Sequence, residues 1–257
     1  AFTGNKFEFR MVGSSFSLAG PNITINTIVA DSLRQFADEL EGAKDFNAAL
    51  HDLVVREIKA HKRIIFNGNN YAPEWAEEAE KRGLLNLKNA AEALPHFADK
   101  KNIELFERNK VFTEREVVTR TDIMLENYSK VLNIEALTMI DMAKQDIYPA
   151  VEGYISSLCG ALKEKKGTLP GVSFPAQERM IAKLASDAER MLERAEMLDS
   201  LLVEAKAHDT PAKLASFFAE KVIPVMQELR AYADGMELNT AASVWPFPTY
   251  GDILFSV

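Results

Sequence analysis

The apolar residues between positions 181 and 205 follow a pattern that strongly restricts how this chain can fold. They recur at alternating steps of three and four residues, at Ile181, Leu184, Ala188, Met191, Ala195, Leu198, Leu202 and Ala205. This spacing places them on one face of an α-helix. The segment is therefore predicted to be a helix of about 30 residues, roughly 45 Å long. Its apolar face needs a second helix to cover it.

A second long helix is predicted before this segment. Residues 113–116, with the sequence TERE, form a capping box that marks its start. An apolar residue then recurs every seven positions, at Val118, Leu125, Leu132 and Met139. The helix is predicted to bend or break at Pro149 and to end near Gly167.

A third long helix is predicted after the segment, with Thr210 as its N-cap and Pro211 in its first turn. Pro224 should introduce a kink. Short connections between three long helices favour antiparallel neighbours, so residues 113–257 are predicted to form an antiparallel long-helix bundle. A dimeric coiled coil would satisfy the same apolar pattern and stays open as an alternative.

The first part of the chain carries a different pattern. Residues 6–12 alternate strictly, with Phe7, Phe9 and Met11 on one face and Lys6, Glu8 and Arg10 on the other, which predicts a short β-strand. A helix closing near Gly42 is predicted next, and then a helix capped by Asp45. The predicted organisation has three parts: residues 1–66 with the strand and these helices, an irregular connecting region at 67–112, and the bundle at 113–257. The fold class is mainly α, with a short β segment in front of the bundle.

The end of the chain is predicted to dock on a surface. Residues 245–250 read WPFPTY, a stretch that its prolines keep extended and that is too aromatic to stay in water. We expect it to pack on the body of the chain or on a partner subunit.

Composition excludes two classes of partner. The net charge is −8 and no run of Lys and Arg stands out, so nucleic acid is not an expected partner. No apolar run approaches the roughly 20 residues that span a bilayer, so no membrane span is expected. The single cysteine, Cys159, is expected to be a buried small hydrophobe and fits the reducing cytoplasm. The chain lacks an initiator Met and is expected to be a piece of a longer protein.

Lys6, Glu8 and Arg10 are the candidate functional residues, because the strand places a carboxylate between two cations on one face. A carboxylate suits a hard cation such as Mg²⁺, and the cations suit phosphate or carboxylate oxygens. The pattern equally describes a solvated face with weak ion pairs. The four histidines have no spacing typical of a metal site.

Several separated motifs together resemble the carboxy-terminal region of type III glutamine synthetases. They are FTGNKFEFRMVGSS at 2–15, AGPN at 19–22, NLK at 86–88, ALP at 93–95, NIEALTM at 133–139, WPFPTY at 245–250 and LF at 254–255. The resemblance covers nearly the whole chain. It implies that residues 1–66 are the end of an α+β catalytic domain, of which the β segment is a remnant.

The resemblance implies an ATP-dependent ligase that joins ammonia to glutamate through γ-glutamyl phosphate, with Mg²⁺ or Mn²⁺ in the parent enzyme. Carried over by position, Glu8 matches a metal ligand, and Arg10 matches the arginine that holds glutamate or the transferring phosphoryl group. Lys6 falls where many synthetases of other types place an arginine near the nucleotide phosphates, and a Lys supplies a point charge rather than a bidentate fork.

The resemblance also places the remaining metal ligands and the nucleotide pocket upstream of Ala1. The chain alone is therefore expected to be inactive and to bind neither metal nor ATP. Family members assemble as stacked rings, which implies a homo-oligomer. The rival hypothesis is a non-enzymatic helical adaptor or oligomerisation module, for which the strand charges are surface decoration.

Overall fold

The computed structural model describes residues 17–69, 71–248 and 250–255. The described residues are mainly α-helical and contain no strand, which confirms the predicted helical class. The predicted strand at 6–12 lies outside the described residues. The first helices are α1 (Ala19–Glu41), α2 (Phe46–His61), η1 (Lys62–Ile64), α3 (Pro73–Lys81), α4 (Ala90–Ala93), η2 (Leu94–Ala98) and α5 (Lys100–Arg108). The later ones are α6 (Glu114–Asp141), η3 (Met142–Ile147), α7 (Tyr148–Thr168), α8 (Pro175–Ala205), α9 (Pro211–Phe217), η4 (Phe218–Val222), α10 (Ile223–Glu237) and α11 (Tyr250–Leu254).

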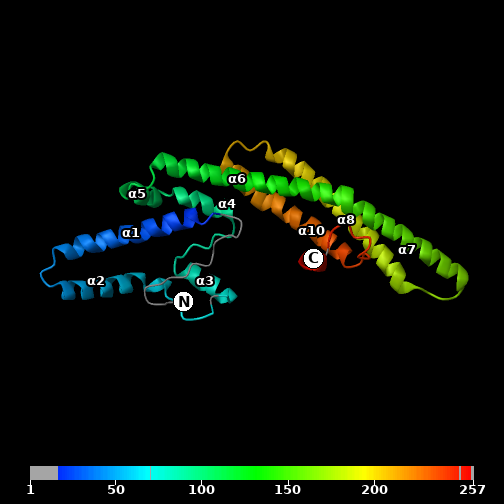
Figure 1. Cartoon of the computed structure of the whole chain (residues 1–257), viewed down its shortest axis with the longest axis horizontal. Coiled ribbons are helices and arrows are strands. Elements are labelled where there is room, and N and C mark those ends of the chain that lie inside the picture. Colours follow the sequence, from blue (N-terminus) through cyan, green and yellow to red (C-terminus); the bar gives the residue numbers. More distant parts are fainter. Residues whose placement is uncertain (1–16, 70, 249, 256–257) are drawn as a thin grey trace. The chain divides into compact units, whose positions relative to one another are not determined.

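The chain divides into two compact units. Unit 1 comprises residues 1–88 and 95–121, and unit 2 comprises residues 89–94 and 122–257. Within unit 1, α1 and α2 form a helical hairpin (Figure 1). Asp45 caps α2 as predicted, because its side chain accepts a hydrogen bond from the Ala48 N–H at 3.1 Å.

An aromatic cluster organises the chain after α2. The rings of Phe66 and Trp75 stack with centroids 4.2 Å apart, and the Arg82 guanidinium lies over both rings. Arg82 also donates to the Ile65 carbonyl at 2.9 Å and to Glu78 Oε1 at 2.6 Å. These contacts fix α3 against the end of the hairpin although few residues there are buried.

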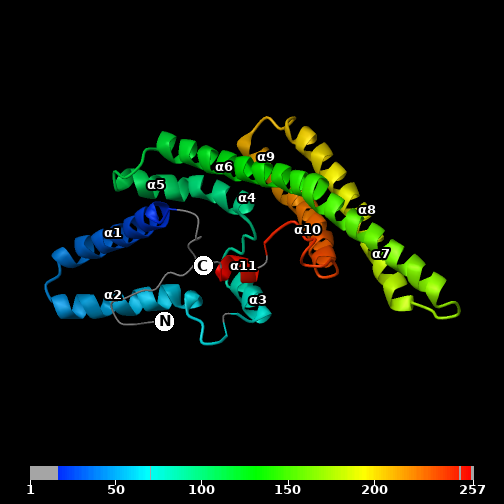
Figure 2. The ribbon, with the colours of Figure 1, turned by 45° about the vertical axis from the view of Figure 1, so that its right-hand side comes forward.

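Unit 2 is built from three helical segments that lie along one another: α6–η3–α7, then α8, then α9–η4–α10 (Figures 1 and 2). The chain reverses between α7 and α8 and again between α8 and α9, so α8 packs within the chain against both α7 and α10. Every residue of the three-four pattern except the partly buried Ile181 is buried in α8. The apolar face predicted from spacing is thus covered by helices of the same chain.

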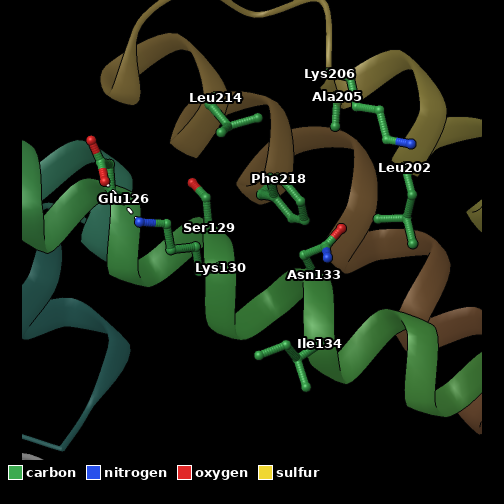
Figure 3. A pocket seen from close by; sticks show the side chains of 10 residues that line it. All are labelled: Glu126, Ser129, Lys130, Asn133, Ile134, Leu202, Ala205, Lys206, Leu214 and Phe218. Atoms are coloured by element: carbon green, nitrogen blue, oxygen red, sulfur yellow. Dashed lines mark hydrogen bonds and ion pairs between the residues drawn. The ribbon is translucent and has the colours of Figure 1, made fainter.

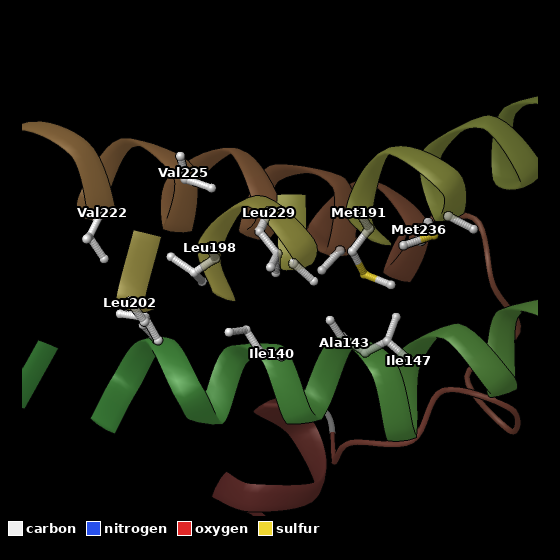
Figure 4. Packing of buried hydrophobic residues seen from close by; sticks show 14 of the residues in the cluster. Ile140, Ala143, Ile147, Met191, Leu198, Leu202, Val222, Val225, Leu229 and Met236 are labelled. Carbon is white, nitrogen blue, oxygen red and sulfur yellow. The ribbon is translucent and has the colours of Figure 1, made fainter. Parts of the chain in front are cut away.

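The core of unit 2 lies where these helices meet. Ile140, Ala143 and Ile147 face inward from α6 and η3 toward α8 and α10 (Figure 4). The partners they meet are Met191, Leu198, Leu202, Val222, Val225, Leu229 and Met236. Such close packing makes each of these positions sensitive to a change in volume.

Neither long-helix proline ends its helix. A π-helical turn precedes each one: η3 ends at Ile147, two residues before Pro149, and η4 ends at Val222, two residues before Pro224. The Tyr148 N–H bonds to the Ala143 carbonyl, five residues back. Proline lacks a donor and crowds the preceding turn, and the wider π turn accommodates it. The predicted break at Pro149 is therefore wrong, and a π turn precedes the proline instead.

Two further expectations fail at single positions. Val118, which the seven-residue repeat groups with Leu125, is 42% exposed, while its neighbour Val117 is fully buried. Cys159, expected to be buried, is exposed on α7. Both residues are surface positions because nothing packs over that side of their helices within the described residues.

The aromatic tail docks on the body of the chain. Trp245 and Phe247 are partly buried and pack against the core of unit 2, with their ring centroids 6.4 Å apart. This confirms the first of the two docking sites expected for the tail.

Candidate functional site

The three predicted site residues, Lys6, Glu8 and Arg10, lie outside the described residues. The structure does describe α1, the helix that follows them closely in sequence.

A buried carboxylate fastens α1 to α5. Asp31 is 4% exposed, and it accepts hydrogen bonds from Arg108 Nε and Nη2, both at 2.8 Å. Asn109 Nδ2 donates to it at 2.8 Å and Gln35 Nε2 at 2.7 Å, and Arg34 adds a longer bond. These donors, led by Arg108 and then Asn109, hold the pKa of the Asp31 carboxyl well below its ordinary value.

A second ion pair joins α1 to α2. Arg56 donates from Nη1 and Nη2 to the two carboxylate oxygens of Glu39, at 2.7 and 2.8 Å. This bidentate pairing lowers the pKa of Glu39. Charged groups thus link α1 both to α5 and to α2.

The apolar residues of the hairpin are largely left without cover. In α1 the buried side chains are Thr27 and Asp31, whereas Val29 is 49% and Leu33 60% exposed. In α2 an apolar residue recurs every four positions and each one is at least 37% exposed, namely Phe46, Leu50, Val54 and Ile58. We call these residues of α1 and α2 the hairpin apolar face. An exposed apolar row of this length is typical of a surface that another part of a protein covers.

Metal ligands do not gather in the part of the chain that the structure describes. Among those residues, no group of three or more His, Cys, Asp or Glu side chains is placed to hold a metal ion. His96 Nδ1 lies 3.0 Å from Asp99 Oδ2, and His61 lies close to Glu57, but Glu57 also pairs with Arg56 and neither histidine joins a larger group of ligands. The same residues contain no helix long and apolar enough to cross a membrane.

Unit 2 contains a cavity of about 400 Å³ between α6, the end of α8 and the α9–η4 segment. Ser129 and Asn133 rise from α6 toward Phe218 and Leu202 (Figure 3). The remaining lining residues are Glu126, Lys130, Ile134, Ala205, Lys206 and Leu214. No sequence pattern had pointed to this site, because its walls come from helices far apart in the chain.

The chain is similar to known glutamine synthetases over its whole length. Residues 49–166 match the family described as the glutamine synthetase C-terminal domain. The chain is 33% identical to the type-3 glutamine synthetase of Dictyostelium discoideum over 272 residues, covering 99% of this chain and 36% of that protein. It is 34% identical to a glutamine synthetase of Butyrivibrio fibrisolvens over 264 residues, covering 100% of this chain and 37% of that protein. The chain is a homologue of the carboxy-terminal part of type III glutamine synthetases.

The resemblance inferred from separated motifs is thereby confirmed. A glutamine synthetase of Bacteroides fragilis, 28% identical, also aligns with the whole of this glutamine synthetase homologue. The chain spans little more than a third of the length of the curated relatives it matches. The matched C-terminal domain runs from α2 to near the end of α7 and so includes residues of both units.

Sequence reasoning missed Asp31 as an important residue of this synthetase homologue. Its partners Arg108 and Asn109 are 77 and 78 positions away. The one local signal is a carboxylate on the polar side of α1, and that feature is shared by many solvent-exposed helices.

Proposed function

We propose that this chain is the carboxy-terminal part of an ATP-dependent glutamate–ammonia ligase that forms glutamine through γ-glutamyl phosphate. The observation that carries the proposal is an alignment that runs through 99% of the chain yet covers 36% of a type-3 glutamine synthetase. The activity belongs to the longer protein, and glutamate, ammonia and ATP are its substrates. The adaptor hypothesis gains no comparable support.

In this proposal Glu8 is one ligand of an active-site Mg²⁺ or Mn²⁺ ion. Arg10 holds glutamate or the transferring phosphoryl group, because a guanidinium matches carboxylate and phosphate oxygens with two parallel hydrogen bonds. Lys6 contributes a positive charge near the nucleotide phosphates. In this proposal the other metal ligands and the nucleotide site belong to the rest of the enzyme.

The hairpin apolar face supports the idea that residues 1–66 are the end of a larger catalytic domain. The contacts that α1 makes within unit 1 centre on a polar residue, Asp31, and its apolar side is left exposed. A catalytic domain supplied by the same polypeptide would cover that side. In the same organisation, residues 67–112 connect and residues 113–257 form the C-terminal antiparallel bundle.

The proposal extends to assembly and location. Exposed apolar residues on α6, among them Val131 and Leu137 at 42% and 46%, offer surface for contacts between subunits of a homo-oligomer. We place the protein in the cytoplasm, where its substrates would meet it and where a single exposed Cys159 stays reduced.

The test compares the 257-residue chain with the protein translated from the coding sequence that continues upstream of it. We expect glutamine formation by the longer protein and none by the chain alone, because one carboxylate and two cations cannot bind both metal and ATP. Glutamine formation by the chain alone would refute the proposed division of the active site. An upstream sequence without further carboxylates, arginines and a histidine would instead support the adaptor.

The roles of the strand residues are tested in the longer protein. Glu8→Gln should raise the Mg²⁺ or Mn²⁺ concentration needed for half-maximal activity. Arg10→Ala should lower kcat/KM for glutamate by at least about 100-fold. Glu114→Gln, a change of an exposed residue on α6, is the matched control and should leave both quantities unchanged.

A further inference from the structure

The cavity of unit 2 has apolar walls that belong to the packed core. Leu202 and Phe218 are buried, at 5% and 2% exposure, and the partly buried Leu214 packs against the core beside them. Phe218 begins the π-helical turn η4, so it is positioned by a local change in helix geometry of a kind often found at functional sites. A volume of about 400 Å³ lies in the range of pockets that take small ligands.

Some polar side chains at the rim of the cavity already have a hydrogen-bond or ion-pair partner, and others do not. Lys130 Nζ lies 2.8 Å from Glu126 Oε2 in an ion pair, and the Ser129 hydroxyl donates to the Leu125 carbonyl at 3.1 Å. Within the described part of the chain, the side chains of Asn133 and Lys206 have no such partner. The rim therefore presents one uncompensated ammonium and one free amide above an apolar floor.

Lys206 is not needed to satisfy the end of α8. The carbonyls of Val203, Glu204 and Ala205 accept hydrogen bonds from the backbone N–H groups of the three residues that follow the helix. The ammonium of this exposed side chain is consequently available to a ligand.

We propose that this cavity binds a small amphipathic anion, a monocarboxylate with an apolar chain. The apolar chain lies against Leu202, Leu214 and Phe218, and the carboxylate meets Lys206 and the Asn133 amide at the rim. This combination of a largely apolar lining with few polar groups that fix orientation is typical of small-molecule sites. No residue of the cavity takes part in the ligase function proposed above, so the two proposals stand or fall separately.

The experiment measures binding of octanoate and of octan-1-ol to the 257-residue chain by isothermal titration calorimetry and methyl-detected NMR. We expect saturable octanoate binding, weaker binding of octan-1-ol, and shifts of the Leu202 and Leu214 methyl signals. Lys206→Gln should weaken octanoate binding by up to about fivefold, the upper end for a solvent-exposed charge pair, and leave octan-1-ol unchanged. Lys163→Gln, on the exposed side of α7, is the matched control and should change neither.

A second pair of variants tests the apolar wall. Ile134→Glu adds a negative charge at the cavity and should weaken octanoate binding about tenfold through lost apolar contact and repulsion. Ile123→Glu makes the same change at a similarly exposed position of α6 outside the cavity and should have no effect. The proposal is overturned if octanoate shows no saturable binding, if octan-1-ol binds as tightly, or if the paired variants behave alike.

Discussion

At the scale of single residues, Asp31 shows how a polar side chain can be the main anchor of a helix. The carboxylate is 4% exposed and lies within 2.8 Å of three donor atoms of Arg108 and Asn109. A buried carboxylate is tolerated only where such donors replace water. Its removal should therefore affect the α1–α5 contact more than the loss of any exposed ion pair.

Asp31→Asn should destabilise unit 1, because the amide leaves the Arg108 guanidinium without a counter-charge. We expect a fall in Tm of several degrees, measured by the fluorescence of Trp75 in a Trp245→Phe background. Asp38→Asn is the control, since that carboxylate is 66% exposed and 3.5 Å from Arg34 on the same helix. Its effect should stay within about 0.5 kcal/mol.

The same residue predicts how stability depends on pH. Its donors lower the folded-state pKa of Asp31 below the ordinary value of 3.8. The stabilisation is therefore complete above that ordinary value and is lost as the pH falls below it. Acid should destabilise the parent chain more steeply than Asp31→Asn between about pH 5 and pH 2. Parallel stability profiles for the two proteins would contradict this assignment.

At the scale of elements, the long helices show the value of local signals. The predicted capping box starts α6: the Thr113 N–H donates to Glu116 Oε2 at 2.8 Å and the Glu116 N–H to Thr113 Oγ1 at 3.4 Å. The Thr113 N–H and the Thr113 hydroxyl, which both donate to Glu116 Oε2, lower the pKa of Glu116. The last long helix begins as predicted too, with Thr210 Oγ1 accepting from the Lys213 N–H.

Thr113→Ala removes the hydroxyl that caps α6 and should cost about 1 kcal/mol of stability. Thr119→Ala makes the same substitution at an exposed position inside α6. There the change should be stabilising by a few tenths of a kcal/mol, because Ala has the higher helix propensity. Urea denaturation of both variants measures the difference, and equal effects would show that the capping bonds contribute nothing.

The two prolines show that local sequence signals alone do not predict how a helix responds to a proline. Pro149 was expected to bend or break its helix and Pro224 to kink its helix, and in both places the helical path continues through a π turn. Continuation requires that the neighbouring helices hold both halves in line, and Ile147 and Val222 beside the two turns are indeed buried in the core of unit 2. Packing against neighbouring helices thus decides whether a proline breaks its helix or is accommodated by a π turn.

At the scale of the whole molecule, the two units bury their residues differently. Unit 2 encloses a continuous apolar core from Ala136 to Met236, whereas the α1–α2 hairpin of unit 1 leaves its apolar face exposed. A chain that spans little more than a third of its relatives' length need not complete every domain it enters. The contrast supports our proposal that residues 1–66 are the end of a larger catalytic domain, followed by a bundle that has its own core.

The docked tail gives a prediction at this scale. Trp245 packs on the core of unit 2 from outside its three long segments, so Trp245→Ala should cost about 2 kcal/mol. Phe255→Ala, in the same tail but at a side chain 79% exposed, should change stability by less than about 0.5 kcal/mol. Thermal unfolding followed by far-UV circular dichroism compares the two. Equal stability of both variants would show that docking of the tail does not stabilise the bundle.

The sequence by itself determined the long helices of this protein, most of their starts and the buried side of α8. These features depend on residues within about four positions of one another, as a helix face and a cap do, so the local sequence is enough to predict them. The motifs also determined its kinship with type III glutamine synthetases, now confirmed along the chain.

Only the tertiary structure decided which helices fasten to which. The pairing of Asp31 with Arg108 across 77 positions and the cavity lined by Asn133 and Lys206 both join segments that are distant in the sequence. The exposure of the apolar residues of α1 was likewise decided by the tertiary structure. Each depends on where separate helices meet in space, and the spacing of residues along one helix carries no information about its neighbour.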